Sequence, residues 1–534
     1  MNPANAHPPI AERSGSPCML RAVAACLALF CLLRPAPAQD RELIGRLPDS
    51  AEVVLVVHNA AGILAEADAS PFAPVLRAAG LFNRTLTAWK GLADRLGWTP
   101  RETAERLLGG TCVLVLTEPN EQAGWCLLAT ISAETERRLR ERLEIAPADV
   151  VQGRPVLALR NGEFLLAVQQ DESRQPGRRR LLLLGPSPRP GASLFNDVLP
   201  ALSQDCAAPL RATPVFPLVR DAADAPIALY GNLAPTRDRR WAEHLALSVA
   251  WRPGALTCDI AARLPDAPAF AALPRTSLRA FAAAAQDAPL AIAACTPIEP
   301  LRRSGLSWSA SADDPPAEPG AFERWALLLH PAPDDAAAGG PTLHRAALLV
   351  ESSGPGGCDA LALRLGRLLE GPQTTLGLAT EGLPPATLRR TTFDAGGSAM
   401  ARRIFGPVGH LAWSRCAGAA GGGGATDAGT QRWSTVALAP TQAAADRSWR
   451  DACDLASALH APANDADRWV TVGRIDPRLF LAVAPGPWPD GSPTRTMLER
   501  LTLLAWEFRA QDDGLIRGSI RLDVAPTPPA PNAP

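Results

Sequence analysis

Apolar and polar residues alternate with a period of two along two long stretches of the chain, which predicts two β-hairpins. Residues 247–264 alternate on both sides of Pro253-Gly254, and residues 504–524 alternate on both sides of Asp512-Asp513-Gly514. A period of two is typical of strands with one buried face, and both interruptions have turn-forming sequences. We therefore predict a hairpin at a corresponding place in each half of the chain.

The segment before each hairpin also repeats. Residues 227–235 match residues 469–477 at an offset of 242, so that Gly231 falls on Gly473. Apolar strand runs at 53–57, 112–116 and 125–131 have counterparts at 290–294, 325–329 and 346–350. Fixed-spacing similarity indicates duplication. We predict an α+β fold of two tandem, similar α+β halves with antiparallel sheets and flanking helices; two unrelated domains of one class are the alternative.

Helices are predicted mainly from their ends. Leucine and tryptophan recur on one face of residues 86–96, and Gly97 closes this helix. Thr99-Pro100-Arg101-Glu102 has the sequence of a capping box, with proline in the first turn. A further helix is predicted from about Ser132, where acidic and basic residues recur four positions apart.

The N-terminus has the order of a secretory signal peptide. Arg21 precedes a 12-residue apolar run, Ala22 to Leu33, and Ala36-Pro37-Ala38 follows. We predict cleavage between Ala38 and Gln39, and export to the periplasm, cell envelope or extracellular space. A membrane anchor is the alternative, but a spanning helix needs about 20 apolar residues. Met19 is an alternative start.

Segments rich in proline and glycine separate the predicted parts of the chain. The predicted layout is a signal peptide at 1–38, a first α+β repeat at 39–266, a linker at 267–286, a second α+β repeat at 287–525 and a disordered tail at 526–534. The linker has room for a short alanine-rich helix. The tail is rich in proline, as disordered termini often are.

Charge and composition exclude some functions. The chain has 53 basic and 54 acidic side chains, so its net charge of −1 argues against nucleic-acid binding and against a polybasic membrane role. Lys90 is the one lysine and precedes Gly91, which excludes a P-loop and leaves a single residue for Schiff-base chemistry.

Eight cysteines would remain after removal of residues 1–38, and none has C-x-x-C spacing. An exported protein permits disulfides, but cysteine inside an apolar run is also a common core residue, and both interpretations stay open. The first candidate disulfide joins Cys112 and Cys126, because they lie on consecutive predicted strands. Eight cysteines allow 105 pairings, so the sequence alone does not give the connectivity.

Three short motifs suggest a family. They are Leu47-Pro48-Asp49-Ser50-Ala51-Glu52, Ala69-Ser70-Pro71-Phe72 and Leu107-Leu108-Gly109-Gly110, each at the edge of a predicted element. They resemble a bacterial family of exported proteins, known as a domain of unknown function and common in planctomycete-type genomes. The resemblance covers about residues 47–264 and, more faintly, the second half. It implies export and an α+β fold, and it brings no catalytic signature.

The search for catalytic motifs yields no assignment. No histidine pair has His-Glu-x-x-His spacing, Arg240 breaks the inverted version that includes His244, and Gly397-Ser398 lacks the second glycine of a nucleophile elbow. His58 follows a strand but is favoured as a hydrogen-bonded loop residue. Arg178-Arg179-Arg180 is favoured as a solvated guard of a sheet edge. We therefore predict no catalytic, cofactor-binding or metal residue and no cofactor.

Three functions fit these observations. The favoured one is an exported, non-catalytic structural or interaction protein of the bacterial cell envelope, whose partner is an envelope protein or polymer. The alternatives are a ligand-binding protein with a cleft between the halves, and an exported hydrolase whose site is assembled from distant residues. We expect no nucleic-acid partner and no stable membrane span after cleavage.

Overall fold

The fold is known from a computed structural model, in which the chain forms two compact units. Unit 1 comprises Met1–Ala69 and Gly80–Gly231, and unit 2 comprises Ser70–Ala79 and Asn232–Pro534. The structure describes residues 44–49, 51–74, 90, 93–117, 124–143, 145–151, 154–159, 164–170, 179–186, 194–203, 209–212, 216, 225–232, 243–252, 254–264, 267–276, 278–298, 321–332, 343–352, 361–362, 365, 388–395, 398–417, 432–460, 467–483 and 490–525. The predicted signal peptide with its Ala38–Gln39 cleavage site, and the tail at 526–534, lie outside the described residues.

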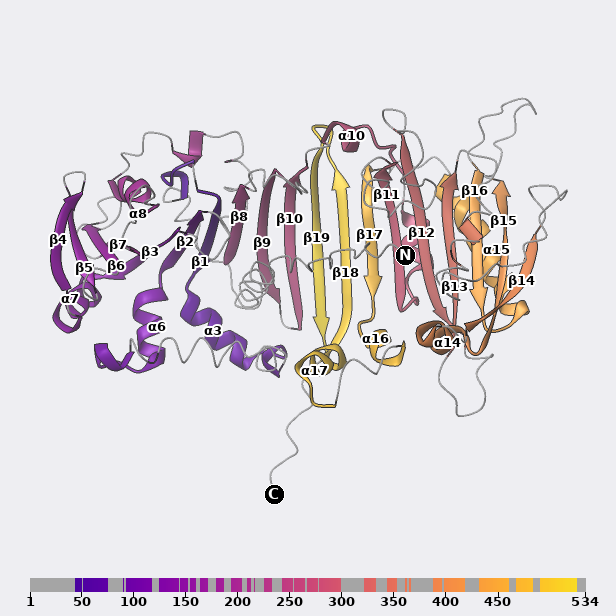
Figure 1. Ribbon diagram of the computed structural model, residues 1–534, viewed down its shortest axis with the longest axis horizontal. Coiled ribbons are helices and arrows are strands. Elements are labelled where there is room, and N and C mark those ends of the chain that lie inside the picture. Colours follow the sequence, from indigo (N-terminus) through magenta and orange to yellow (C-terminus); the bar gives the residue numbers. More distant parts are fainter. Residues whose placement is uncertain are drawn as a thin grey trace, which may run out of the picture. The chain divides into compact units, whose positions relative to one another are not determined.

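Unit 1 is built on one antiparallel sheet (Figure 1). In spatial order its strands are β4 (Ile145–Val151), β5 (Arg154–Leu159), β6 (Phe164–Gln170), β7 (Arg179–Pro186), β3 (Gly124–Ser132), β2 (Thr111–Thr117), β1 (Val53–His58) and β8 (Ile227–Asn232). Its helices are α3 (Ala60–Ala69), α6 (Pro100–Leu108), α7 (Ala133–Arg142), α8 (Leu194–Val198) and the 3₁₀ helices η2 (Leu199–Ser203) and η3 (Leu210–Ala212).

Unit 2 is built on a wider antiparallel sheet. In spatial order its strands are β9 (His244–Arg252), β10 (Ala255–Arg263), β19 (Leu515–Val524), β18 (Leu501–Ala510), β17 (Trp469–Ile475), β11 (Leu290–Pro297), β12 (Phe322–Pro331), β13 (His344–Ser352), β16 (Arg432–Ala439), β15 (Val408–Ala417) and β14 (Arg389–Asp394). Its helices are α10 (Ala267–Ala271), α11 (Arg279–Ala284), α14 (Ala399–Phe405), α15 (Gln442–His460), α16 (Arg478–Val483) and α17 (Pro493–Arg500).

These elements confirm the predicted α+β class with antiparallel sheets and flanking helices. The two predicted hairpins are β9–β10 and β18–β19. Gly254 and Gly514 lie in their turns with φ of +78° and +76°, the left-handed region that favours glycine. The predicted capping box is also present: Thr99 Oγ1 accepts from the Glu102 backbone N–H, and the Glu102 carboxylate accepts from the Thr99 N–H at 2.8 Å.

The β9–β10 hairpin belongs to unit 2, because β10 pairs with β19 along its whole length from Ala255 to Arg263. The compact units therefore divide after Gly231, whereas the predicted first repeat runs on to residue 266. The predicted linker is structured, since it includes the two short helices α10 and α11. Phe281 of α11 is buried in the core of unit 2.

Small residues bring α15 close to the sheet of unit 2. α15 lies against β13, β15 and β16 (Figure 1). Its buried side includes Ala452 and Ala456, which pack with Ala293, Ala326 and Ala347 of the sheet. The opposite face of the same strands carries larger side chains and is covered by α14. The sheet thus has a buried core on both faces in this region.

Candidate functional site

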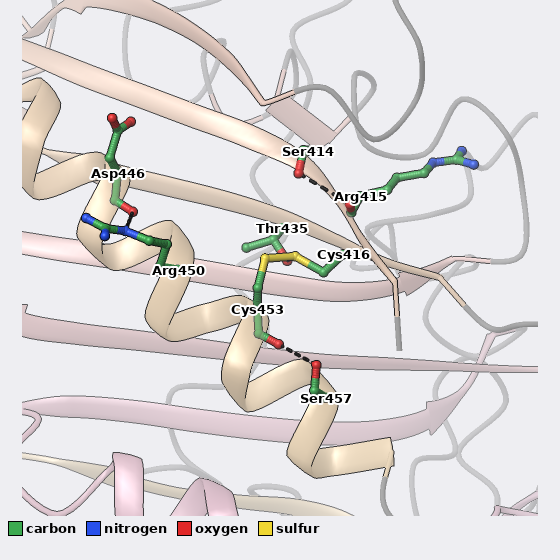
Figure 2. The surroundings of a disulfide bond; sticks show 8 residues. All are labelled: Ser414, Arg415, Cys416, Thr435, Asp446, Arg450, Cys453 and Ser457. Carbon is green, nitrogen blue, oxygen red and sulfur yellow. Dashed lines mark hydrogen bonds between the residues drawn. A yellow bond between two sulfur atoms is a disulfide. The ribbon is translucent and has the colours of Figure 1, made fainter. Parts of the chain in front are cut away.

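A disulfide joins α15 to the sheet of unit 2. Cys416 of β15 bonds Cys453 of α15, with their Cα atoms 5.5 Å apart (Figure 2). The Cys416 sulfur also lies 3.2 Å from the hydroxyl oxygen of Thr435 on the neighbouring strand β16. The bond therefore links a helix to the face that it covers.

The predicted Cys112–Cys126 disulfide is wrong, because both cysteines are free and buried. Cys126 stands opposite Val115 in the β2–β3 ladder, three residues from Cys112. Successive side chains of a strand point to opposite faces, so the two thiols lie on opposite sides of the sheet. Cys112 packs in one core cluster and Cys126 in another. Burial raises the pKa of each thiol to about 12, so both stay protonated.

An arginine, a glutamate, a cysteine and a tryptophan are buried together on the face of the sheet that α15 covers. Arg324 of β12 faces Cys295 of β11, and Glu351 of β13 faces Trp433 of β16. The Arg324 Nε lies 3.1 Å from a Glu351 carboxylate oxygen, and both side chains are buried. The guanidinium carbon also lies 5.8 Å from the centre of the Trp433 ring. Burial raises the pKa of Cys295 to about 12, so this thiol is protonated and unreactive.

An open surface cavity of about 760 Å³ lies at the end of the β18–β19 hairpin where the two strands are joined. We call it the charged basin. It is lined by Arg275, Asp467, Arg468, Glu507, Arg509, Ala510, Gln511, Asp512, Asp513, Arg517 and Gly518. Four arginines and four acidic residues thus share one open surface. Backbone hydrogen bonds bring these distant segments together: Thr276 and Asp467 exchange two, and the Ala510 N–H donates to the Arg468 carbonyl.

Ion pairs hold most of the charged side chains of the basin. Asp512 accepts from Arg468 and, at 3.4 Å, from Arg275, and the hydrogen bond from Arg468 lowers the Asp512 pKa. Arg509 lies 2.8 Å from Asp467, and its guanidinium carbon is 4.1 Å from the centre of the Trp469 ring. These contacts fix the positions of the guanidinium and carboxylate groups.

One pairing in the basin is unfavourable by itself. Arg509 and Arg517 stand directly opposite each other on β18 and β19. Like charges at opposed positions of two strands repel, unless neighbouring carboxylates compensate. Glu507, 3.7 Å from Arg509, and Asp467 supply part of that compensation. The basin thus keeps two adjacent guanidinium groups at an exposed surface by surrounding them with acids.

The other residues that the sequence singles out have structural contacts. His58 is the last residue of β1 and is buried, so it is not the predicted loop residue, but its Nδ1 lies at hydrogen-bond distance, 2.9 Å, from the Thr111 hydroxyl oxygen. The predicted role of Arg179 and Arg180 as guards of a sheet edge is wrong, because their strand β7 lies between β6 and β3. Arg180 instead pairs with Glu136 of α7 at 3.1 Å, and Arg178 lies outside the described residues. Burial lowers the pKa of His244, which keeps its imidazole neutral.

Two features are absent from the described residues. No group of three or more histidine, cysteine or acidic side chains among them is arranged to hold a metal ion. Within the same part of the chain, no helix combines the length and the apolar character needed to cross a membrane.

Comparisons with known proteins add little. No family model matches this chain, and no curated protein matches it. Among solved structures it is similar to crystal form III of TP0453, at 10% identity and a TM-score of 0.26, over 43% of this chain and 80% of that one. A TM-score this low carries no argument about fold or function.

Proposed function

We propose that the protein is an exported, non-catalytic interaction protein of the bacterial cell envelope, built from two similar halves, and that the charged basin binds its partner. The observation that carries the interaction role is the basin itself, where fixed charges of both signs converge on one open surface. The resemblance of the Leu47–Glu52 and Leu107–Gly110 motifs to exported proteins of unknown function is in keeping with this proposal.

Strand order supports the two-half organisation. Seven strands of unit 1 lie in the order β5-β6-β7-β3-β2-β1-β8, and seven strands of unit 2 lie in the order β14-β15-β16-β13-β12-β11-β17. The two orders are the same if β1, β2 and β3 correspond to β11, β12 and β13, and β5 to β8 correspond to β14 to β17, with β4 left out of the comparison. Gly231 stands opposite Val53 in the first set, and Gly473 stands opposite Ile292 in the second, two residues beyond Leu290, the sequence counterpart of Val53. Two unrelated α+β domains would not be expected to share this crossover pattern.

The Cys416–Cys453 disulfide supports export. Disulfides persist in oxidising compartments and are rare in reducing cytoplasm. The short apolar run before Ala38 supports the same localisation, since it has the order of a cleaved signal.

The partner of the basin is expected to be a protein surface that carries both charge signs. A small-molecule site is usually concave and mostly apolar, with few polar groups. The basin has the opposite character, because charged side chains make up most of its lining. Paired charges at an interface mainly select the correct partner and speed its association. Recognition of a protein with complementary charges fits that chemistry.

Export is tested on the protein as cells make it. We expect N-terminal sequencing of the envelope fraction to begin at Gln39, and thiol labelling under denaturing conditions to leave Cys416 and Cys453 unmodified until a reductant is added. A retained apolar segment, or both cysteines labelled without reductant, would contradict the proposed localisation.

The interaction is tested by placing a photoreactive amino acid at Gln511, on the lining of the basin. We expect crosslinking in intact cells to give a discrete product, and Asp512→Arg, which reverses an exposed charge, to reduce its yield. The control carries the photoreactive group at Glu141, an exposed position of α7 in unit 1. No product from Gln511, or the same product from both positions, would rule out the basin as the contact surface.

A further inference from the structure

Large apolar side chains are exposed at one place in unit 2. Met400 is 52% exposed, Val408 51% and Phe480 37%, and among the described residues no other large apolar side chain is classed as exposed. Met400 belongs to α14, Phe480 to α16, and Val408 begins β15. We call these three residues the end patch.

The three residues lie at the same end of the sheet. The end of β17, which leads into α16, pairs through Ile475 with the start of β11, and the antiparallel ladders carry that end across β12, β13 and β16 to the start of β15. α14 precedes that start, and Figure 1 shows α14, α16 and α17 together there. The charged basin is at the opposite end, where β18 leads into β19.

The exposed side chains stand on firmly packed helices. Ala401 and Phe405 of α14 and Leu479 of α16 are buried in one core cluster. Their neighbours Met400 and Phe480 point away from that cluster and are exposed. Each helix therefore covers the core with one side and presents an apolar residue on the other. Exposed apolar patches, especially those rimmed by polar residues, mark protein or membrane interaction sites.

Positive charge accompanies the end patch. α14 carries Arg402 and Arg403, both exposed, and it has no acidic residue. Arg478 opens α16, although Asp476 pairs with it at both carboxylate oxygens. Asp394 of β14, which is also exposed, stands opposite Val408, so these residues around the end patch comprise three arginines and two carboxylates, whereas the net charge of the whole chain is −1.

We propose that the end patch docks on the surface of a membrane containing anionic lipids. Met400, Val408 and Phe480 would enter the boundary between headgroups and acyl chains, while Arg402 and Arg403 contact lipid phosphates. Apolar residues flanked by arginine are typical of segments that lie in a membrane interface. The protein attaches from one side, so this proposal is separate from a transmembrane span and from the proposed role of the charged basin.

The small area of the end patch favours a membrane over a protein as its partner. A stable protein interface buries about 800 Å² on each partner, which three side chains do not provide. A membrane surface needs only a few inserted side chains, because each arginine near anionic lipid strengthens binding about fivefold. Charge complementarity between α14 and anionic headgroups completes the match.

The test is co-sedimentation of the protein with vesicles. The protein used begins at the residue that N-terminal sequencing of the envelope fraction identifies. One set of vesicles contains phosphatidylcholine alone, and the other contains two thirds phosphatidylcholine and one third phosphatidylglycerol. We expect binding to the anionic vesicles that weakens as salt rises. Met400→Ser/Phe480→Ser should weaken it about tenfold, and Arg402→Gln/Arg403→Gln about twentyfold.

A matched control removes two arginines elsewhere. Arg137→Gln/Arg142→Gln makes the same charge change on α7 of unit 1, and it should change binding by less than twofold. Circular dichroism checks that every variant is folded. The proposal is overturned if the protein does not bind anionic vesicles, if both vesicle types bind it equally, or if the end-patch variants bind like the control. If the end-patch variants still bind vesicles but lose the crosslinked product formed from Gln511, the proposal is also overturned, and the end patch is assigned to a protein partner.

Discussion

Removal of the Cys416–Cys453 disulfide should lower the stability of unit 2 by about 4 kcal/mol. The bond closes a loop with a sequence separation of 37 residues. In the chain-entropy model, a loop of this length removes about 13 cal/mol/K from the unfolded chain, which is about 4 kcal/mol at 25 °C. The perturbation is Cys416→Ser/Cys453→Ser, because a single substitution would leave a free thiol in a buried place.

The assay has to report on unit 2, since a chain with two compact units need not unfold in one step. Urea unfolding is therefore followed by hydrogen exchange in peptides from α15. We expect the midpoint to fall and the protection of α15 to decrease in the double variant. Adding a reductant to the unchanged protein should have the same effect, and adding it to the double variant should have none.

Two results would refute this reasoning. If reductant and double variant both leave the midpoint unchanged, the bond does not constrain the unfolded chain. If protection is lost equally in unit 1 and in α15, the disulfide acts on the whole protein and its role is not to hold α15 to the sheet.

Other predictions concern unit 2. Arg324→Met should cost about 3–5 kcal/mol in urea unfolding, because it removes the guanidinium that lies 3.1 Å from the buried Glu351 carboxylate, and Arg324→Met/Glu351→Leu should recover most of that loss; an equal loss of stability in the single and the double variant would contradict a strong pair. Gly473→Ala should cost about 1–3 kcal/mol, since a Cβ there would lie 2.3 Å from the Trp506 ring, and Trp506→Leu should reduce the cost. Burial lowers the pKa of His344, so the unfolded state binds its proton more readily. The contribution of neutral His344 to the free energy of unfolding should therefore be complete above pH about 6.5 and fall as the pH drops below it. His344→Gln should reduce the dependence of the free energy of unfolding on pH in this range. An unchanged dependence would contradict the prediction.

Local patterns predict the secondary structure well, because they depend on neighbouring residues. The alternation around Pro253-Gly254 and Asp512-Asp513-Gly514 gives both hairpins, and the Thr99–Glu102 sequence gives the cap of α6. A strand's period and a cap's spacing are properties of a short stretch of chain. The predicted linker is different, because Phe281 becomes buried only against residues that lie far along the sequence.

The same limit explains the wrong disulfide. Adjacent strands bring Cys112 and Cys126 near each other along the sheet, but the register decides which face each side chain occupies. Register follows from the turn between the strands, and the sequence does not specify it there. Cys416 and Cys453 are joined because α15 folds back over β15, a tertiary contact with no local signal.

The charged basin could not have been predicted for a related reason. Arg275, Asp467 and Asp512 come from three separate stretches of chain. Each stretch by itself looks like an ordinary solvated loop. The backbone bridge between Thr276 and Asp467 is what makes them one surface.

The pairing of β10 with β19 has a consequence for synthesis. β10 is complete once residue 263 has been made, but its partner on the side away from β9 is the last strand of the described chain, Leu515–Val524. A chain that stops before β19 would leave the backbone N–H and C=O groups along one edge of β10 open, and an open edge invites pairing with other chains. Prematurely ended products should therefore aggregate or be degraded, and full-length synthesis becomes a condition for a protected sheet.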